Sequence, residues 1–559
     1  MTASTNNVAS RLADTARTNP DGLAIAEPLK RGRDGVYQYR RCTFAELQED
    51  SDRLARGLLN LGLQPGARMA LMVRPGIDFI SLVFAMLKAR IVMVLIDPGL
   101  GRRNLIACLQ AVNPDGFVAI PPAQAIRTLL RRRFPRARTN VTVGRRWFWG
   151  GTTISRLRSQ PANGFQIAET QSSDPAAIIF TSGSTGPPKG VLYEHGTFVA
   201  QVEHLQQHYG IQPGDIDLPG FPLFALFNSA MGVSTILPEM DFTQPANVEP
   251  QNIIDPVVQW NVTQSFGSPT LWNTVGRYCE SAQVKLPTLK RIFSAGAPVP
   301  PHVLARMKQV IAVDGDIYTP YGATEALPVA SISASEVLSE TETLSRQGAG
   351  TCVGTRFSGM QWRVIEIDDR PLATLDDTIE VAPGQIGELI VQGAVVTPRY
   401  VTRTDANADH KITDGDGFWH RMGDVGYLDS QDRFWFCGRK GHRVMTRKRT
   451  LFTVPCEAIV NNHPAVYRSA LVGIGEAGNQ RPVIVVETWP ERRPSTTDEE
   501  DRLLAELRQQ VAADTLTQDI VDILLHPSLP VDIRHNAKIF REKLAPWAAQ
   551  QLANTGSTG

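Results

Sequence analysis

The 559-residue chain lacks several features that secreted and membrane proteins share. Its six cysteines are scattered without a CxxC pair, which argues against a disulfide framework or a zinc site and predicts reduced thiols. The first residues, MTASTNNVASRLADTART, have no apolar core of the kind that a signal peptide needs. The most apolar stretch, residues 79–96, is interrupted by Lys88 and Arg90, so neither part is long enough to span a bilayer. We therefore expect a cytoplasmic protein without a transmembrane segment.

The chain also has almost no net charge. The formal charge is +1, with 42% hydrophobic and 20% charged residues, so no overall field points to nucleic acid or to an acidic partner. One stretch departs from this balance, because it holds eight arginines without an acidic residue and precedes the aromatic residues 147–149. The eight are Arg127, Arg131, Arg132, Arg133, Arg136, Arg138, Arg145 and Arg146. We interpret this stretch as a solvated helix face and loop, or as a docking patch for a partner protein or for the phosphate of a thioester carrier.

Most of the chain alternates between strand-like and helix-like segments. A chain of this length needs more than one core, and the alternation predicts an α/β fold with helix-covered parallel and mixed sheets. Thr43 and Glu46 have the spacing of a capping box and predict a helix through about Leu61. The other predicted elements are strands at residues 69–73, 91–96, 264–267 and 292–294 and helices at residues 78–88 and 252–260.

Beyond about residue 354 the pattern changes twice. Short strands at residues 361–367, 386–392 and 434–436 predict a small β subdomain. The pattern changes again near residue 438, where strands at 470–474 and 483–488, a charged loop at 490–501 and a helix from Arg502 predict a small α+β unit. We therefore expect a large N-terminal domain, residues 1–437, and a mobile C-terminal lid domain, residues 438–559, with a disordered tail from Asn554.

Residues 178–190, IIFTSGSTGPPKG, predict a loop that binds polyphosphate. Apolar runs at 176–180 and 191–193 flank this loop. Its glycines let backbone N–H groups approach an anion, its hydroxyls donate hydrogen bonds, and Lys189 adds a positive charge. It is not a Walker loop, because Lys189 is not followed by Ser or Thr and a strand-like segment comes next. The alternative interpretation is a flexible Gly/Ser turn.

Further polar segments follow other predicted strands. Residues 294–298, SAGAP, offer a backbone shelf beside a planar ligand. Tyr321, Thr324 and Glu325 bring together a ring that can stack on a base, a hydroxyl that can donate to phosphate and a carboxylate that can hold Mg²⁺. Asp424, in the segment RMGD, offers a carboxylate to ribose hydroxyls. Lys538 follows near the end of the chain, among basic neighbours.

Together these motifs resemble those of the adenylate-forming superfamily, which includes acyl-CoA synthetases, nonribosomal-peptide adenylation domains and luciferases. Five motifs occur in the family order, and the resemblance covers about residues 43–544. It implies that ATP and Mg²⁺ are used. The residues it assigns to ATP are Thr181, Ser182, Gly183, Ser184, Thr185 and Lys189 at the triphosphate, Gly296, Ala297, Pro298, Tyr321 and Gly322 around the adenine, and Asp424 and Arg439 at the ribose.

The same resemblance assigns three catalytic residues. It implies that Thr324 contacts the α-phosphate, that Glu325 carries Mg²⁺, and that Lys538 reaches the reacting carboxylate and the α-phosphate. A carboxylate that attacks the α-phosphate meets another anion, and a lysine, a metal ion and preorganised donors offset this repulsion. His195 matches a histidine that the family often has near this place, and we interpret it as structural.

Residues 438–448 depart from the pattern of acyl-CoA synthetases. Gly441 replaces a charged hinge residue, Met445 replaces a lysine, and Lys448 replaces a glycine that helps to admit the pantetheine arm of CoA. Residues 535–537, HNA, replace the common Ser/Thr-x-Gly. With the segments TPYGATEALPV, HRMGDVGYLD and FWFCGRKGHRV, these variants resemble the β-lactone synthetases of long-chain olefin biosynthesis.

This second resemblance implies a 2-alkyl-3-hydroxy fatty acid as substrate, whose own 3-hydroxyl closes a β-lactone and expels AMP. It also implies the thiolase, reductase and decarboxylase of that pathway as partners. His195 and His442 are candidates for the base only by residue type. The alternatives are a long-chain fatty acyl-CoA ligase, a fatty acyl-AMP ligase, and a silent nucleotide-binding scaffold, against which the presence of Lys538, Glu325 and Asp424 argues.

The apolar segment 221–228, FPLFALFN, is a candidate for the acyl-binding site. Ala225 stands where many acyl-CoA synthetases carry histidine, and an apolar wall suits an alkyl chain better than an amino acid. The candidate contacts are Phe224, Ala225, Phe227 and Asn228. A role in core packing is equally natural for these side chains.

Overall fold

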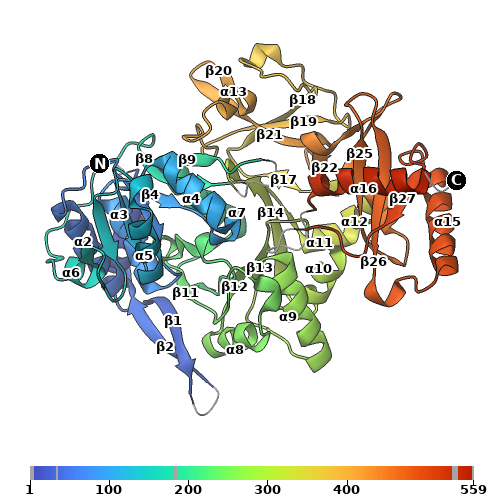
Figure 1. Ribbon diagram of the computed structural model, residues 1–559. Coiled ribbons are helices and arrows are strands. Elements are labelled where there is room, and N and C mark those ends of the chain that lie inside the picture. The colour runs from blue at the N-terminus through green and yellow to red at the C-terminus, as the bar shows by residue number, and fades with distance from the viewer. Residues whose placement is uncertain (1–5, 33–35, 182–185, 532–538, 557–559) are drawn as a thin grey trace.

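The computed structural model describes residues 6–32, 36–181, 186–531 and 539–556, and its elements form an α/β protein with several sheets (Figure 1). Within these residues no helix is both long enough and apolar enough to cross a membrane. All six cysteines belong to the described part of the chain, and all are buried free thiols.

A seven-stranded sheet carries the predicted phosphate loop. Its strands in spatial order are β7 (Thr152–Thr153), β6 (Thr139–Thr142), β5 (Gly116–Ala119), β3 (Arg68–Met72), β4 (Val92–Leu95), β8 (Pro175–Phe180) and β9 (Gly190–Glu194). All are parallel except β9, which forms an antiparallel hairpin with β8. The loops after β6 and β8 therefore leave the same edge of the sheet.

Helices cover both faces of this sheet. Along β3 and β4, alternate side chains enter two different cores, as the pleat of a strand requires. One core includes α1 (Ala9–Thr18), α2 (Phe44–Asn60), α3 (Ile77–Lys88) and α6 (Ile154–Arg158). The other includes α4 (Gly101–Val112) and packs against α5 (Pro121–Leu129). Thr43 and Glu46 form the expected capping box at the start of α2.

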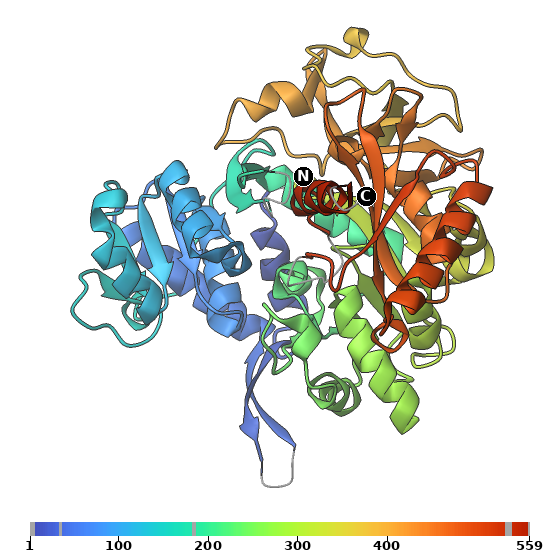
Figure 2. The same cartoon turned by 45° about the vertical axis from the view of Figure 1, so that its right-hand side comes forward.

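A nine-stranded sheet carries the adenine shelf and the segment with Tyr321, Thr324 and Glu325. Its order is β17 (Thr355–Arg356), β15 (Ala326–Ser333), β14 (Asp316–Ala323), β13 (Arg291–Ser294), β12 (Gln264–Gly267), β10 (Ile216–Asp217), β11 (Ser234–Ile236), β1 (Leu23–Arg31) and β2 (Tyr37–Thr43). Its neighbouring helices are α7 (His195–Tyr209), α8 (Gln251–Trp260), α9 (Pro269–Ala282), α10 (Pro301–Lys308) and α11 (Ala334–Glu336), and α12 (Glu342–Arg346) follows α11 in the chain. The β1–β2 hairpin extends away from the rest of the molecule in both views (Figures 1 and 2).

A six-stranded antiparallel sheet follows, as the short strands predicted. It consists of β16 (Thr351–Cys352), β22 (Phe434–Arg439), β21 (Gly417–Leu428), β19 (Gly387–Gln392) and β18 (Gln361–Ile365), with β20 (Lys411–Asp414) beside β21. The short helix α13 (Ala406–His410) precedes β20.

The elements after β22 have cores of their own. They are β23 (Val444–Met445), β24 (Thr450–Leu451), α14 (Thr453–Asn461), β25 (Val466–Ile474), β26 (Arg481–Thr488), α15 (Thr497–Ala513), β27 (Asp522–Leu525) and α16 (Arg541–Gly556). Figure 1 shows α16, in red, against the sheet of β25, β26 and β27. The domain boundary at residue 438 and the mobility of this unit stay predictions.

Most predicted elements are confirmed within a few residues, but two expectations near the end are wrong. The helix expected from Arg502 begins at Thr497, because Thr496 caps it and Asp498, Glu499 and Glu500 stabilise the positive end of its dipole. Residues 497–501 of the expected charged loop therefore belong to the helix. The tail was expected to be disordered from Asn554, but residues 554–556 belong to α16, and residues 557–559 lie outside the described residues.

Lys88, which interrupts the longest apolar stretch, is fully buried. Its ammonium donates to Asp52 at 2.7 Å, to Ser51 at 2.7 Å and to the side chain of Gln48 at 2.8 Å. Burial lowers the pKa of Lys88 to about 8, and the Asp52 carboxylate opposes this shift. A buried lysine therefore joins α2 and α3 where the sequence indicated only a break in hydrophobicity.

Candidate functional site

The predicted phosphate loop is the connection of the β8–β9 hairpin. The backbone N–H of Thr181 donates to the carbonyl of Lys189 at 3.0 Å, and the N–H of Lys189 donates to the Thr181 hydroxyl at 3.0 Å. The next N–H, of Gly190, donates to Thr402 Oγ1 at 2.7 Å. Thr181 and Lys189 thus close the base of the loop. Ser182, Gly183, Ser184 and Thr185 lie outside the described residues.

The Lys189 ammonium is held by neutral groups. Its Nζ lies 3.0 Å from His410 Nε2 and 4.6 Å from the ring centroid of Tyr400. Among the described residues no carboxylate lies within ion-pair distance of it, although Glu325 is near enough to oppose the lowering of its pKa by burial. A partly buried ammonium without a protein counter-ion fits a phosphate ligand.

Thr324 and Glu325 form the turn of the β14–β15 hairpin. The Tyr193 hydroxyl donates to the carbonyl of Thr324 at 2.6 Å, and the Tyr400 hydroxyl donates to Glu325 Oε1 at 2.7 Å. The second carboxylate oxygen of Glu325 accepts no hydrogen bond from the described residues. This arrangement fits a Mg²⁺ ligand, because one oxygen fixes the carboxylate and the other stays available.

Tyr321, Asp424 and Arg439 join the nine-stranded and six-stranded sheets. The Tyr321 hydroxyl donates to Asp424 Oδ2 at 2.5 Å, and Arg439 Nη1 donates to Asp424 Oδ1 at 2.6 Å. Asp424 and Arg439 are direct partners in the β21–β22 register. Burial, and then the Asp424 charge, raise the pKa of Tyr321 well above its usual value. Asp424 is buried, so a ribose would share this carboxylate with Tyr321 and Arg439.

The adenine shelf is open. Gly296, Ala297 and Pro298 follow β13, and Gly296 and Pro298 are exposed. Gly296 has a φ of +93°, a conformation that other residues adopt only with strain. At Gly322 a Cβ would lie 2.5 Å from the carbonyl of Ala326, so the end of β14, before Thr324, requires glycine.

Sequence reasoning missed a segment between β19 and β20. Val396 pairs with Ala326 and Tyr400 with Val191 in isolated bridges, so this segment reaches two other sheets. The N–H and the hydroxyl of Thr397 both donate to the carbonyl of Glu325 at 2.9 Å. Tyr400, Thr402 and His410 thereby contact Glu325, Gly190 and Lys189. No local motif marks them, because their role depends on long-range packing.

We expect neutral His410 to accept a hydrogen bond from the Lys189 ammonium and so to fix its position. Burial, and then the Lys189 charge, lower the pKa of His410 to about 4. We expect His410→Ala to raise KM for Mg-ATP about tenfold, because a hydrogen bond to a charged group contributes about 1.5 kcal/mol. KM for the acid should not change. Steady-state kinetics from pH 5 to 8 check this, since a His410 that titrated near pH 7 would contradict the neutral form.

The candidate acyl segment is packed into the protein where it is described. Ala225, Phe227 and Asn228 are buried, and Phe227 lies against Phe198 with ring centroids 4.8 Å apart. The Asn228 amide donates to Asp217 at 2.7 Å and to Thr235 at 3.1 Å. The Phe224 side chain lies outside the described residues. Phe227 and Asn228 therefore pack in the core, while the acyl-binding role of the segment stays a prediction.

His195 begins α7 fully buried, and burial lowers its pKa to about 4. Neither ring nitrogen has a hydrogen-bond partner within the described residues. Its position favours the structural interpretation over a role as base. Lys538 lies outside the described residues.

The residues that differ from the acyl-CoA synthetase pattern lie after β22. Gly441 is the exposed residue of the 3-10 turn η8 (Lys440–His442). The Lys440 ammonium bonds the buried carboxylate of Glu388 at 3.1 Å, and Arg421 pairs with the same oxygen. Lys448, in the turn of the β23–β24 hairpin, is largely exposed and pairs with Asp519 at 3.0 Å.

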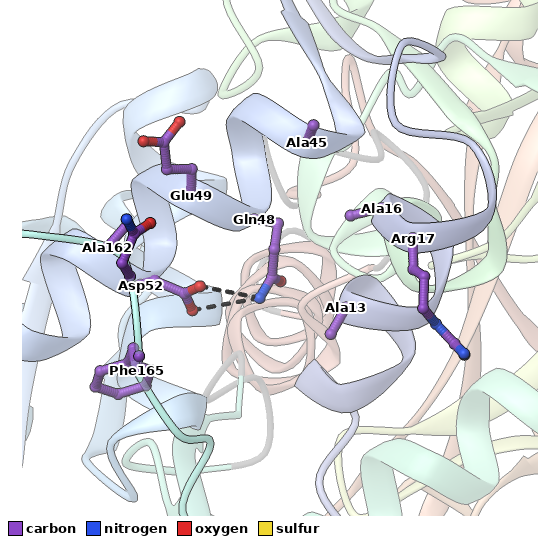
Figure 3. A pocket seen from close by; sticks show the side chains of 11 residues that line it. Ala13, Ala16, Arg17, Ala45, Gln48, Glu49, Asp52, Ala162 and Phe165 are labelled. Atoms are coloured by element: carbon purple, nitrogen blue, oxygen red, sulfur yellow. Dashed lines mark hydrogen bonds between the residues drawn. The ribbon is translucent and has the colours of Figure 1, made fainter.

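A separate cavity of about 390 Å³ lies beside α1 and α2 (Figure 3). Its wall includes Arg17, Glu49, Phe165 and the hydrogen-bonded pair Gln48 and Asp52. None of the predicted site residues lines it, and Gln48 and Asp52 of its wall accept hydrogen bonds from the buried Lys88. It is not part of the candidate site.

Comparisons with known proteins identify the family of this chain. The model of a family described as AMP-binding enzyme matches residues 12–401. The chain is 45% identical to the olefin beta-lactone synthetase of Xanthomonas campestris pv. campestris and 44% identical to that of Stenotrophomonas maltophilia, each over 98% of both chains.

Solved structures show the same fold. The amide bond synthetase McbA from Marinactinospora thermotolerans has a TM-score of 0.77 at 20% identity and covers 97% of this chain and 99% of its own. The O-succinylbenzoate coenzyme A synthetase of Bacillus subtilis, in complex with ATP and magnesium ion, has a TM-score of 0.72 at 19% identity, covering 96% of this chain and 98% of its own. With the family match over most of its length, this chain belongs to the AMP-binding enzyme family.

Proposed function

We propose that the protein activates a long-chain 2-alkyl-3-hydroxy fatty acid with ATP and closes it to a β-lactone. The observation that carries this proposal is the 45% identity, over 98% of both chains, to an olefin beta-lactone synthetase. The arrangement of Lys189, Glu325 and Asp424 supports the use of a nucleotide. Pathway thiolase, reductase and decarboxylase partners, and a cytoplasmic location, belong to the same proposal.

In the first step a carboxylate oxygen attacks the α-phosphorus of ATP and pyrophosphate leaves. Lys189 and the loop from Thr181 would hold the phosphates, and Asp424 with Arg439 would hold the ribose. Glu325 would hold Mg²⁺, which neutralises charge on the phosphates. Thr324 would contact the α-phosphate, and Lys538 would offset the repulsion between the two anions.

In the second step the 3-hydroxyl attacks the activated carbonyl. A new ester C–O bond closes the ring, the bond from the carbonyl to the phosphate oxygen breaks, and AMP leaves while the hydroxyl loses its proton. Because the nucleophile is tethered, effective molarities of ~10⁵–10⁸ M are within reach and no second substrate has to enter. An exposed cation at Lys448, in place of the glycine that admits pantetheine, suits a reaction without CoA.

The decisive assay offers the purified protein Mg-ATP and a 3-hydroxy-2-alkyl acid, with and without CoA. We expect β-lactone and AMP in equal amounts, at the same rate in both mixtures, measured by mass spectrometry. A fatty acid without the hydroxyl is the control, because it can proceed only to the adenylate. If product forms only when CoA is present, the protein is an acyl-CoA ligase and the proposal is wrong.

A further inference from the structure

The positive charge of the chain is concentrated in one segment of its sequence. Residues 116–168 contain ten arginines and no lysine, aspartate or glutamate. Removing these ten charges from the total of +1 leaves −9 for the rest of the chain. A protein that is neutral as a whole therefore has a strongly basic region.

Exposed apolar side chains lie among these arginines. Leu129 is 83% exposed, Trp147 63% and Phe148 79%. Arg131, Arg132 and Arg133 follow Leu129 as the exposed 3-10 turn η2 (Arg131–Arg133), and the exposed Arg145 and Arg146 precede Trp147. We call Leu129, residues 131–133 and residues 145–148 the basic–aromatic surface.

The fold places these residues on one side of the sheet. The cores of α4 and α5 lie on the face opposite α2 and α3, and η2 directly follows α5. The loop with Trp147 connects β6 to the parallel strand β7, a crossover in the same direction as that through α5, so the right-handed rule puts both on one face. Figure 1 shows α4 and α5 on the side of the molecule away from the C-terminal unit.

The loop that contains Trp147 and Phe148 is fixed to the sheet by the neighbouring Trp149. Trp149 is buried, and its indole N–H donates to Thr142 Oγ1 at 2.9 Å. The ring of Trp147 stacks on that of Trp149 with centroids 6.2 Å apart, and Arg146 donates to the carbonyl of Gly151. Two aromatic side chains are thus held outward by a structured loop.

The arginines of this surface have few protein counter-ions. Arg131, Arg132, Arg133 and Arg145 form no ion pair within the described residues, and Asp115, the nearest acidic residue in the chain, pairs with Arg136 at 2.6 Å. Long basic side chains beside exposed tryptophan and phenylalanine match the charged headgroups and the apolar layer beneath them at a membrane surface.

We propose that the basic–aromatic surface docks the protein on an anionic lipid bilayer. Arginines contact the headgroups, while Trp147, Phe148 and Leu129 enter the interface. β6 and β8 end at the same edge of the sheet, about 19 Å apart across four strand spacings. Docking therefore brings Thr181 and Lys189, at the base of the predicted phosphate loop, near the lipid, where an acid with two alkyl chains, the substrate of the proposed function, partitions.

Vesicle co-sedimentation of the full-length protein tests this proposal. We expect binding to phosphatidylcholine vesicles that contain phosphatidylglycerol and none to pure phosphatidylcholine. Arg132→Gln/Arg133→Gln should weaken binding about 30-fold, since each basic residue near the surface contributes about fivefold. Trp147→Ser/Phe148→Ser should weaken binding without changing its dependence on salt. The matched control is Arg502→Gln/Arg508→Gln, which removes two exposed arginines from α15 and should change nothing.

Failure of the wild-type protein to bind anionic vesicles overturns the proposal and leaves a solvated surface or a docking patch for an acidic protein. Equal weakening in the α15 control also overturns it, because net charge alone would then explain binding. All variants should keep the wild-type rate of ATP–pyrophosphate exchange with a short, soluble acid. Since sedimentation needs neither ATP nor turnover, this result is independent of whether the lactone is the product.

Discussion

Lys538→Ala should slow formation of the acyl-adenylate by about 10²–10³, the usual cost of removing one preorganised group that stabilises charge in the transition state. The carboxylate and the α-phosphate are both anions, and Lys538 is the cation assigned to both. ATP–pyrophosphate exchange measures this step alone. Closure of the lactone from a synthetic acyl-adenylate should remain, because the repulsion has already been overcome in that compound.

The described residues on either side of Lys538 form defined contacts. One of them therefore offers a matched control variant. Val531 pairs with Ile539, and Arg541 donates to both carboxylate oxygens of the buried Glu457 at 2.6 and 2.8 Å. Lys543→Ala removes an exposed lysine from the same region, whose ammonium lies 4.6 Å from the ring centroid of Phe540. Exchange at the wild-type rate is expected for Lys543→Ala. The same rate in Lys538→Ala would refute the mechanism.

Residues whose roles are local could be predicted from the sequence. The glycines and hydroxyls before Lys189 predict a phosphate loop because loop backbone and side chains act within a few residues of one another, and this assignment stays a prediction. The capping box of Thr43 and Glu46 is likewise local, and the structure confirms it. The alternation of strands and helices was sufficient for the α/β class, since it reflects which segments can bury an apolar face.

Residues whose roles depend on distant packing could not be predicted. Tyr400 and His410 reach Glu325 and Lys189 because the segment between β19 and β20 pairs with strands of two other sheets. Lys88 broke an apolar stretch in the sequence, yet it is buried because Asp52 faces it from another helix. The start of α15 was misplaced because acidic residues are typical both of loops and of first helical turns.

Glu325→Gln should reduce adenylate formation by about 10²–10³ and raise the Mg²⁺ concentration needed for half-maximal rate. The amide keeps the size of the side chain and an oxygen that can accept from Tyr400, but it loses the negative charge that a hard cation prefers. Titration of ATP–pyrophosphate exchange with Mg²⁺ at saturating ATP measures both effects.

Two further variants separate charge from position. Tyr400→Phe removes the 2.7 Å hydrogen bond to Glu325 while it keeps a ring beside Lys189, so a smaller loss of about tenfold is expected. Glu366→Gln neutralises an exposed glutamate just beyond β18 and should leave the Mg²⁺ dependence unchanged. If Glu325→Gln and Glu366→Gln had the same Mg²⁺ dependence, Glu325 would not hold the metal. Tyr400 fixes one carboxylate oxygen of Glu325, and the titration measures whether the other oxygen binds Mg²⁺.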